Sequence, residues 1–584
     1  EKKGTLLWVL DRTKTSPGAR LLRQWVEHPL LSPAHIARRQ GAVEELVGDY
    51  MKREELGELL SHVLDMERLI TRIVFGTAGG KDLRAVCATA SVLPDIRRLL
   101  EGCQSEELKR IWREMDMLED VCTEIGRALV EEPPFSIREG GMIADGYDDE
   151  VDRLRTVMND GQGWVDRVAA EEKARTGIKT LKVGYNKVFG YYIEVSKSFA
   201  DQVPANYIRK QTLVGAERYI TQELKDMEAT ILGAKDKLCA LEYELFCKLR
   251  GFVADRSERI QKTAALLAEA DVYRSLASVA SRNRYVRPEV VEDDRISIRD
   301  GRHPVVEKFV KDGYFVPNDA DLDTRDNRLM LITGPNMAGK STYMRQVALI
   351  VLMAQIGSFV PASSAHIGIA DRIFTRVGAS DDLASGQSTF MLEMTEVSAI
   401  LRGATRKSLI IYDEVGRGTS TFDGMSIARA IIEYTAGRRI GARTLFATHY
   451  HELTGMEGAY EGIVNYHIAA RKRGDTVTFL RKIVRGSTDD SFGIEVAKLA
   501  GLPNEVIRRA REILAAVETS SRAVREAVDE ADNGRKTAKP DDGALSLDDC
   551  LNERLIDELR ALDVNTLSPF ECMSLLFEWK KQIR

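Results

Sequence analysis

Apolar positions in the first 130 residues recur every three to four residues, which is the spacing of one face of a helix. Short proline and glycine breaks interrupt this pattern, as at Pro17-Gly18 and Gly79-Gly80. The helical pattern returns in residues 149–173, where a single apolar stripe runs along a charged segment. These positions predict an all-α packing region followed by a long helix.

A different pattern begins near residue 180. Residues 180–183 and 191–195 are rich in β-branched and aromatic side chains, and a turn ending at Gly190 separates them, which predicts a β-hairpin. Beyond the hairpin, apolar residues are spaced alternately four and three positions apart. This heptad spacing, or heptad seam, predicts a helix roughly 40 Å long. The seam comprises Ile220, Leu224, Met227, Ile231, Ala234, Leu238, Leu241 and Leu245. Two long helices that flank a small β-module would form an extended lever with the β-module at its tip. The alternative is a pair of core helices joined by a β-containing insertion.

From about residue 287 the pattern becomes α/β. Residues 328–333, 408–412 and 444–448 are short apolar runs separated by helical stretches, which predicts a parallel sheet covered by helices. Residues 494–516 predict two short helices. The polar segment 518–549 is typical of disorder, and residues 551–583 return to an amphipathic helical pattern.

Composition narrows the class of protein. The 584 residues, of which 44% are hydrophobic, suffice for several domains. Acidic residues outnumber basic ones by 90 to 84, which excludes a uniformly basic nucleic-acid coat and leaves local basic patches open. The seven cysteines form no CxxC pair, which argues against a disulfide framework or a zinc site. The cysteine usage also indicates a reducing compartment, so we expect a cytoplasmic location. The best apolar run, 347–356, is too short to cross a bilayer, so we expect no membrane contact.

One segment carries a phosphate-binding motif, GxxxxGK[ST] or Walker A. It reads Gly334-Pro335-Asn336-Met337-Ala338-Gly339-Lys340-Ser341, followed by Thr342. It lies between a predicted strand and a predicted helix, where backbone N–H groups and the helix N-terminus favour an anion. We expect Lys340 to reach the β- and γ-phosphates of ATP and Ser341 to ligate Mg²⁺. A glycine-proline turn without a ligand is the alternative.

The second and third apolar runs also end in polar residues. Asp413 and Glu414 follow the second run, where Asp413 suits the Mg²⁺ shell and Glu414 suits polarisation of an attacking water. His449 directly follows the third run. It is either a satisfied cap at the strand end or, next to the phosphate end of the other strands, a sensor of the γ-phosphate. His451 lies two residues further on, but we reject zinc because no third ligand is evident.

A fourth segment, residues 385–391, places glycine and hydroxyl residues, among them Ser388, before a predicted helix at 392–401. Such donors at a helix N-terminus suit a second anion site. A helix cap alone would also explain them.

Along the chain, these four elements follow the order P-loop, residues 385–391, Asp413-Glu414 and Thr448-His449, and this order resembles the layout of ABC-type ATPases. Their amino-acid sequences resemble more specifically the MutS family of bacterial DNA mismatch repair proteins. The resemblance runs from Gly4 to about Ala516 and continues more weakly beyond. Its most specific segments are Thr333-Gly334-Pro335-Asn336-Met337, residues 381–391, Asp413-Glu414-Val415-Gly416-Arg417-Gly418-Thr419 and Ala447-Thr448-His449-Tyr450.

The resemblance implies further roles. Phe315 would stack on adenine, while Asn336 and Ser388 would complete the site of a partner subunit, so hydrolysis would require a homodimer. A clamp would grip the backbone of duplex DNA, and a MutL-type partner and tetramers formed through the C-terminal module are implied as well. Residues 178–212 hold six basic and two acidic residues, a patch that suits phosphate contacts or is merely a solvated face. The proposed DNA-binding residues are Lys179, Lys182, Lys187, Arg209 and Lys210.

The resemblance also has a gap. Members of the family begin with a mismatch-reading domain that carries a Phe-x-Glu wedge, and with a connector domain. Neither precedes Gly4, and the chain starts without Met, so we expect a fragment with equal affinity for matched and mismatched duplexes. A natural MutS-like homologue acting in recombination control and a nucleotide-stabilised structural scaffold are the alternatives.

Together these predictions give a multidomain protein. We expect an all-α core with long lever helices, a small β-containing clamp, and a C-terminal α/β P-loop (ABC-type) ATPase domain followed by helical dimerisation elements. The expected ranges are 1–167 for the helical core and first lever, 168–227 for the clamp, 228–286 for the returning lever and core, 287–486 for the ATPase domain, 487–518 for the helical dimerisation region, 519–549 for a disordered linker and 550–584 for a C-terminal helical module.

Overall fold

The structure is a computed structural model that describes residues 3–186, 188, 190–310, 314–335, 338–377, 389–473, 476–487 and 493–514. The chain divides into two compact units, Glu1–Asp490 and Ser491–Arg584. The first unit is rich in helices and also contains sheets, which confirms the multidomain, helix-rich class. In the second unit, α16 (Gly493–Leu499) and helical residues 504–514 correspond to the two short helices expected there. The predicted linker and C-terminal module lie outside the described residues.

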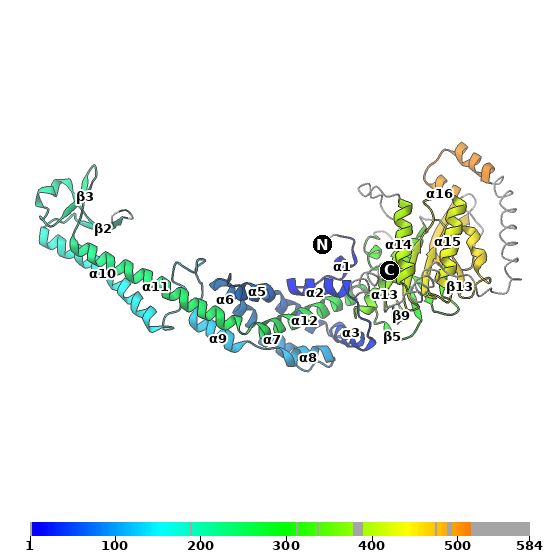
Figure 1. Cartoon of the computed structure of the whole chain (residues 1–584), viewed down its shortest axis with the longest axis horizontal. Coiled ribbons are helices and arrows are strands. Elements are labelled where there is room, and N and C mark those ends of the chain that lie inside the picture. Colours follow the sequence, from blue (N-terminus) through cyan, green and yellow to red (C-terminus); the bar gives the residue numbers. More distant parts are fainter. Residues whose placement is uncertain are drawn as a thin grey trace, which may run out of the picture. The chain divides into compact units, whose positions relative to one another are not determined.

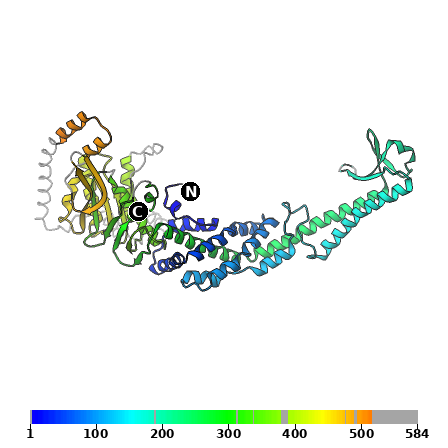
Figure 2. The same cartoon turned by 180° about the vertical axis from the view of Figure 1, so that it is seen from behind.

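Short amphipathic helices surround α12 (Ser257–Asn283), which is buried along most of its length. Helices α2, α3, α4 and α5 contact α12 directly, and Figures 1 and 2 show how they run beside it. This packing is the all-α region that the helical spacing predicts. The helices before the long pair are α1 (Leu6–Leu10), α2 (Ser16–Glu27), α3 (Pro33–Gly48), α4 (Tyr50–Ser61), α5 (Met66–Val74), α6 (Gly80–Ala90), α7 (Leu93–Leu100), α8 (Glu106–Glu114) and α9 (Glu119–Ala128).

Two long helices, α10 (Asp149–Thr176) and α11 (Gln222–Ala254), lie side by side (Figure 1). The side chain of Asp148 caps α10, and the hydroxyl of Thr221 caps α11 by accepting from the N–H of Leu224. The heptad seam therefore begins later than the sequence suggests. Ile220 was expected in the helix but ends a strand, because the cap at Thr221 starts the helix after it.

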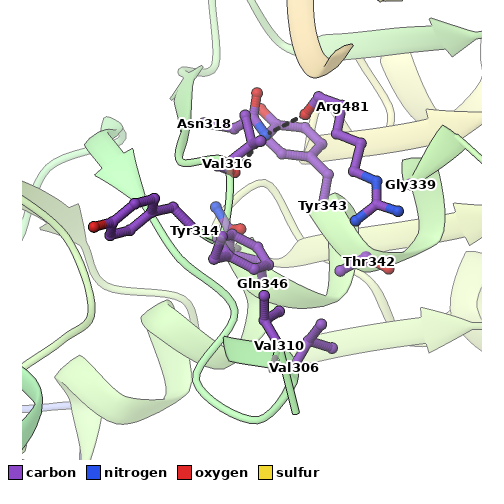
Figure 3. A pocket seen from close by; sticks show the side chains of 11 residues that line it. Val306, Val310, Tyr314, Val316, Asn318, Gly339, Thr342, Tyr343, Gln346 and Arg481 are labelled. Atoms are coloured by element: carbon purple, nitrogen blue, oxygen red, sulfur yellow. Dashed lines mark hydrogen bonds between the residues drawn. The ribbon is translucent and has the colours of Figure 1, made fainter. Parts of the chain in front are cut away.

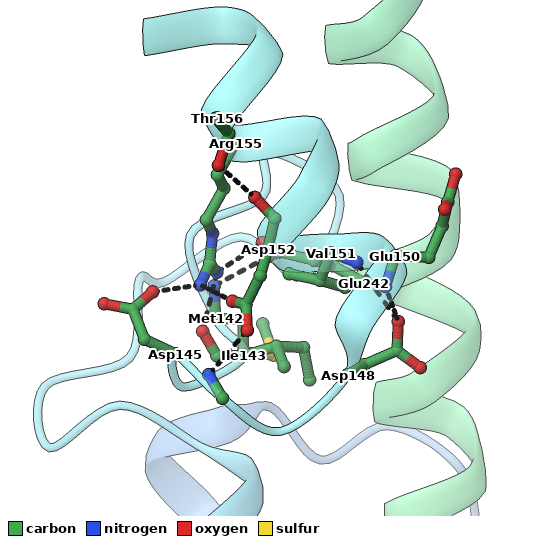
Figure 4. Close-up of polar contacts among 11 residues, drawn as sticks. Met142, Ile143, Asp145, Asp148, Glu150, Val151, Asp152, Arg155, Thr156 and Glu242 are labelled. Atoms are coloured by element: carbon green, nitrogen blue, oxygen red, sulfur yellow. Dashed lines mark hydrogen bonds and ion pairs between the residues drawn. The ribbon is translucent and has the colours of Figure 1, made fainter.

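A buried ion pair joins the two long helices to the segment that precedes them (Figure 4). Glu242 of α11 is only 1% exposed, and its Oε1 lies 2.7 Å from Nη2 of Arg155 in α10. Its other oxygen accepts from the N–H of Met142 at 2.9 Å. Arg155 also donates to the carbonyl of Ile143 and pairs with Asp145. Both carboxylate oxygens are thus paired, and the cluster holds three separate segments together.

The β-module between the long helices is a four-stranded sheet in the order β1-β2-β4-β3. The pairing of β1 with β2 is antiparallel, with Asn186 opposite Gly190, which confirms the predicted hairpin. The sheet has its own apolar core, which takes in Val168 from α10 and Leu224 from α11. The strands are β1 (Lys182–Asn186), β2 (Gly190–Ser196), β3 (Ile208–Thr212) and β4 (Ala216–Ile220), with a short helix η1 (Lys197–Gln202).

A six-stranded sheet in the order β10-β11-β12-β8-β13-β14 contains the three apolar runs as β8, β11 and β12. Its first five strands pair in parallel and β13 with β14 antiparallel, so the predicted parallel sheet is present with an antiparallel edge. The strands are β8 (Leu329–Thr333), β10 (Ile373–Arg376), β11 (Leu409–Asp413), β12 (Arg443–Ala447), β13 (Ile463–Arg473) and β14 (Thr476–Arg485).

Helices cover both faces of this sheet because its inner strands are apolar on both sides. On one face, alternate residues such as Met330 and Ile411 share a core with α13 (Lys340–Gln355). On the other face, their neighbours Leu331 and Tyr412 pack with α14 (Thr389–Gly403) and α15 (Thr421–Ala436). The strand ends are therefore fixed from two sides.

A second small sheet, in the order β5-β9-β6-β7, also belongs to the first unit. Within the described residues, no helix combines the length and apolar character needed to span a membrane. The remaining elements are β5 (Glu289–Val291), β6 (Ile296–Gly301), η2 (Val306–Lys308), β7 (Asn318–Leu322), β9 (Ser364–Gly368) and η4 (His451–Met456).

Candidate functional site

Three neighbouring parallel strands deliver the predicted polar residues to one edge of the six-stranded sheet. Asp413 lies opposite Ala447 in the pairing of β11 with β12, and Ala447 lies opposite Ile332 in the pairing of β12 with β8. The residues that follow each strand therefore meet at one place. This edge is where ligands bind in open α/β sheets.

Lys340 is the first residue of α13, and its side chain is 1% exposed. Its Nζ donates to the carbonyl of Gly334, lies 3.4 Å from the carbonyl oxygen of Thr448 and lies 3.6 Å from Oε1 of Glu414. Burial lowers the pKa of Lys340, and the nearby carboxylates of Glu414 and Asp413 oppose that shift. A buried cation at the positive end of a helix is a site prepared for an anion.

The glycines around Lys340 have backbone conformations that other residues adopt only with strain. Gly334 has φ +128° and Gly339 has φ +109°. Between them, the N–H of Ala338 donates to the carbonyl of Pro335 at 3.2 Å. Asn336 and Met337, also in the predicted motif, lie outside the described residues.

Asp413 ends β11 and carries a polar atom that suits a cation. Its Oδ1 is buried and accepts no hydrogen bond within the described part of the chain. Burial raises the pKa of Asp413, and a hydrogen bond with Ser341 lowers it. A carboxylate oxygen and a hydroxyl beside a phosphate-binding loop are oxygen ligands of the kind that Mg²⁺ takes. The residues present therefore fit the predicted Mg²⁺ site.

Glu414 adopts the left-handed conformation, with φ +57°, although it is not glycine. Its N–H donates to the carbonyl of Ala447 at 3.0 Å, and its Oε2 pairs with Arg417 at 2.8 Å. Such strain in a non-glycine residue costs of order 1–3 kcal/mol and gathers at functional sites. The conformation turns the Glu414 carboxylate toward Lys340.

His449 lies two residues after the end of β12, and its side chain is exposed. Partial burial lowers the pKa of its imidazole, although the charge of Glu414 raises it. The neutral form of the ring is therefore favoured near pH 7, with one ring nitrogen that accepts a hydrogen bond and one N–H that donates. The structure brings His449 to the same strand edge as Lys340 and Glu414.

A pocket beside the predicted phosphate-binding loop is shown in Figure 3. Its lining includes Phe315, the predicted adenine partner. Gly339 and Thr342 also line it, and Arg481 of β14 extends toward Thr342. Sequence reasoning missed Arg481, since a basic residue in an edge strand gives no local signal of a pocket. The other lining residues are Val306, Val310, Tyr314, Val316, Asn318, Tyr343 and Gln346.

The predicted DNA-binding residues are dispersed over the β-module. Lys182 lies in β1 and Arg209 and Lys210 lie in β3, which are opposite edge strands of the sheet, while Lys179 precedes β1. All four side chains are exposed, and Arg209 pairs with Glu217 at 3.2 Å. Lys187, like Ser388 of the second anion segment, lies outside the described residues.

The sequence was compared with those of known proteins. Residues 1–277 match the family described as MutS domain III, and residues 330–518 match MutS domain V. A protein of Ruminiclostridium cellulolyticum is 52% identical over 588 residues, covering 100% of this chain and 67% of its own length. A protein of Acetivibrio thermocellus is 52% identical with the same coverage, and one of Lachnoclostridium phytofermentans is 56% identical over 88% of this chain and 55% of its own length. Each is named DNA mismatch repair protein MutS. The chain thus spans about two thirds or less of these relatives.

Proposed function

This chain belongs to the MutS family, and we propose that it is an ATP-hydrolysing DNA clamp of mismatch repair that works as a homodimer. The observation that carries the ATPase proposal is the cluster of buried charges at the ends of β8 and β11. There Lys340 is 1% exposed beside Glu414, and Asp413 has a buried oxygen that finds no hydrogen-bond partner in the part of the chain that the structure describes. The phosphates of ATP would place negative charge beside Lys340, and Mg²⁺ would bind the buried oxygen of Asp413.

In this proposal the phosphates of ATP lie in the loop from Gly334 to Ser341. Lys340 binds the β- and γ-phosphates, and its short distance to Glu414 becomes longer as Nζ turns from the carboxylate to the phosphates. Ser341 and Asp413 hold Mg²⁺, which supplies charge neutralisation at the phosphate oxygens. The helix dipole of α13 adds to the attraction for the anion.

Glu414 accepts a hydrogen bond from the attacking water and orients it toward the γ-phosphate. His449, neutral near pH 7, contacts the γ-phosphate side of the site. Phe315 stacks on the adenine ring, and the planar guanidinium of Arg481 supplies a second flat surface in the same pocket. ADP would bind through the same pocket and loop.

The β-module would grip duplex DNA through its phosphates. Support comes from Lys179, Lys182, Arg209 and Lys210, which are exposed, and from the separate core that makes the module a compact body. Phosphate contacts need no particular sequence, so this binding would weaken as salt increases. Lys187 is the fifth residue proposed to take part.

Helix α13 offers a route from the nucleotide to the helical core. Lys340 begins this helix, and Gln355 ends it with an amide that donates to the carbonyl of Leu30 at 3.0 Å. The N–H of Leu30 donates in return to the carbonyl of Gln355 at 2.9 Å. A shift of α13 on ATP binding would therefore move the region that carries the long helices.

We propose that Asn336 and Ser388 of one subunit complete the nucleotide site of the other subunit in the homodimer. We also propose that residues 550–584 join dimers into tetramers and that a MutL-type partner docks on the protein. The relatives are bacterial proteins named for DNA mismatch repair, so the proposed location is the cytoplasm, on DNA.

Duplex binding and phosphate release, measured on one preparation, test this function. Fluorescence anisotropy with a labelled duplex should show binding that weakens with salt and changes when ATP is added. Phosphate release from MgATP should accompany it. A chain that binds nucleotide but releases no phosphate and binds no duplex would instead be a nucleotide-stabilised scaffold.

A further inference from the structure

Glu393 of α14 is a buried carboxylate outside the residues assigned above. It is 5% exposed, and its Oε1 accepts a hydrogen bond from the N–H of Gly416 at 2.6 Å. Its Oε2 lies 3.4 Å from Nη2 of Arg376, a buried residue at the end of β10. The carboxylate is thus held by Arg376 and presented to the loop that follows β11.

Gly416 is fixed on its other side as well. Its carbonyl accepts from the hydroxyl of Tyr450 at 2.9 Å, and Tyr450 directly follows His449. Gly416 has φ +91°, and a Cβ at this position would lie 2.5 Å from the carbonyl oxygen of Gly424. The backbone of this loop is therefore set by α14 and by the segment after β12.

Glu414 lies two residues before Gly416 and depends on that backbone. Its own left-handed conformation is strained, so the surrounding bonds must hold it there. One such bond joins its N–H to the carbonyl of Ala447. Glu393 supplies the corresponding bond at the far end of the turn.

We propose that Glu393 is a positioning residue for ATP hydrolysis, which fixes the loop from Glu414 to Gly416 so that the Glu414 carboxylate stays aimed at the attacking water. This inference rests on the proposed ATPase function and assigns no contact between Glu393 and the nucleotide. Loss of Glu393 should lower the rate of the chemical step and leave the affinity for ATP unchanged. A misplacement of about 1 Å in an active site costs up to about 100-fold in rate.

Steady-state ATP hydrolysis, ATP affinity and melting temperature of three variants test the inference. Glu393→Ala should lower kcat about 10- to 100-fold, with KM and the ATP dissociation constant within about twofold. Glu393→Gln should restore most of kcat, because its amide oxygen still accepts from Gly416. Glu396→Ala is the matched control, since Glu396 pairs with the same Arg376 at 3.1 Å from the same helix, and its kcat should equal that of the wild type.

The outcomes separate the inference from the function on which it rests. A wild-type kcat in Glu393→Ala, together with slow hydrolysis by Glu414→Gln, would overturn the inference and leave the ATPase assignment standing. An equal fall of kcat in Glu396→Ala would also overturn it, because the effect would then belong to Arg376. Absence of hydrolysis by the wild-type chain would overturn both.

A fourth variant tests the inference if Glu393→Ala does not fold. Tyr450→Phe removes only the hydroxyl that holds the carbonyl of Gly416. A lower kcat with unchanged ATP affinity supports the role of this loop, and an unchanged kcat contradicts it.

Discussion

Two buried charge clusters in the first unit differ in how completely their polar atoms are paired. At the base of the long helices, both oxygens of Glu242 are paired, with Arg155 and with the N–H of Met142. At the sheet edge, Asp413 has a buried oxygen that accepts no hydrogen bond among the described residues, and Glu414 is strained. A buried polar group without a partner costs free energy, so it persists where another selective pressure retains it.

The difference distinguishes buried charges that stabilise the fold from buried charges that are retained for function. The Arg155–Glu242 cluster joins segments that are far apart in the chain and needs nothing further. In the cluster of Lys340, Asp413 and Glu414, Oδ1 of Asp413 has no hydrogen-bond partner among the described residues, which is the place where the proposed cation would bind. Substitutions in the first should therefore change stability, and substitutions in the second should change nucleotide chemistry.

The largest expected effect is that of Lys340→Ala. Removing the buried cation should lower kcat/KM for ATP by at least about 100-fold, since the phosphates lose a charge-assisted contact. The melting temperature should fall less than in Glu242→Ala, because Glu414 keeps its ion pair with Arg417 when Lys340 is removed. Lys407→Ala, an exposed lysine before β11, is the control. Unchanged kcat and KM in Lys340→Ala would contradict the assignment of the site.

Glu242→Ala should have the opposite profile. It leaves Arg155 without its buried partner and the N–H of Met142 unpaired, which should destabilise the helical region by about 3–5 kcal/mol. The measurement is the urea midpoint of the transition followed by circular dichroism, with ATP hydrolysis measured in parallel. ATP turnover should equal that of the wild type.

The matched control for this variant is Glu244→Ala, in which an exposed pair with Lys248 is lost from the same helix. Exposed pairs contribute about 0–1 kcal/mol. Equal destabilisation by the two substitutions would show that the Glu242 cluster has no special role in stability.

The smallest expected effect is in the β-module, where charges are exposed. Lys182→Ala should weaken duplex binding modestly and reduce the slope of log affinity against log salt by about one. Anisotropy titrations at several salt concentrations measure that slope. Lys248→Ala, on α11 outside the module, should leave it unchanged. A slope that is the same in both variants would exclude Lys182 from the DNA contact.

The sequence predicted those parts of the fold whose signals are local. The strands β8, β11 and β12 are continuous apolar runs, and Lys340, Asp413 and Glu414 follow two of them at spacings that a parallel sheet brings together. The hairpin of β1 and β2 was equally clear from its alternating aromatic and β-branched residues.

The remaining features depend on contacts that no local pattern encodes. Ile220 continues the heptad spacing although it belongs to β4, and only the capping hydroxyl of Thr221 marks the helix start. Arg155 and Glu242 are 87 residues apart, so their pairing is invisible in the chain. Arg481 and Glu393 are ordinary charged residues of a strand and a helix until the fold turns them toward the pocket and the Gly416 loop.

The most direct test of the account is phosphate release from MgATP by the wild-type chain and by Glu414→Gln, with ATP affinity measured for both. We expect turnover by the wild type, and we expect the variant to bind ATP equally well but to hydrolyse it at least about 100-fold more slowly. Equal rates, or a variant that no longer binds ATP, would contradict it.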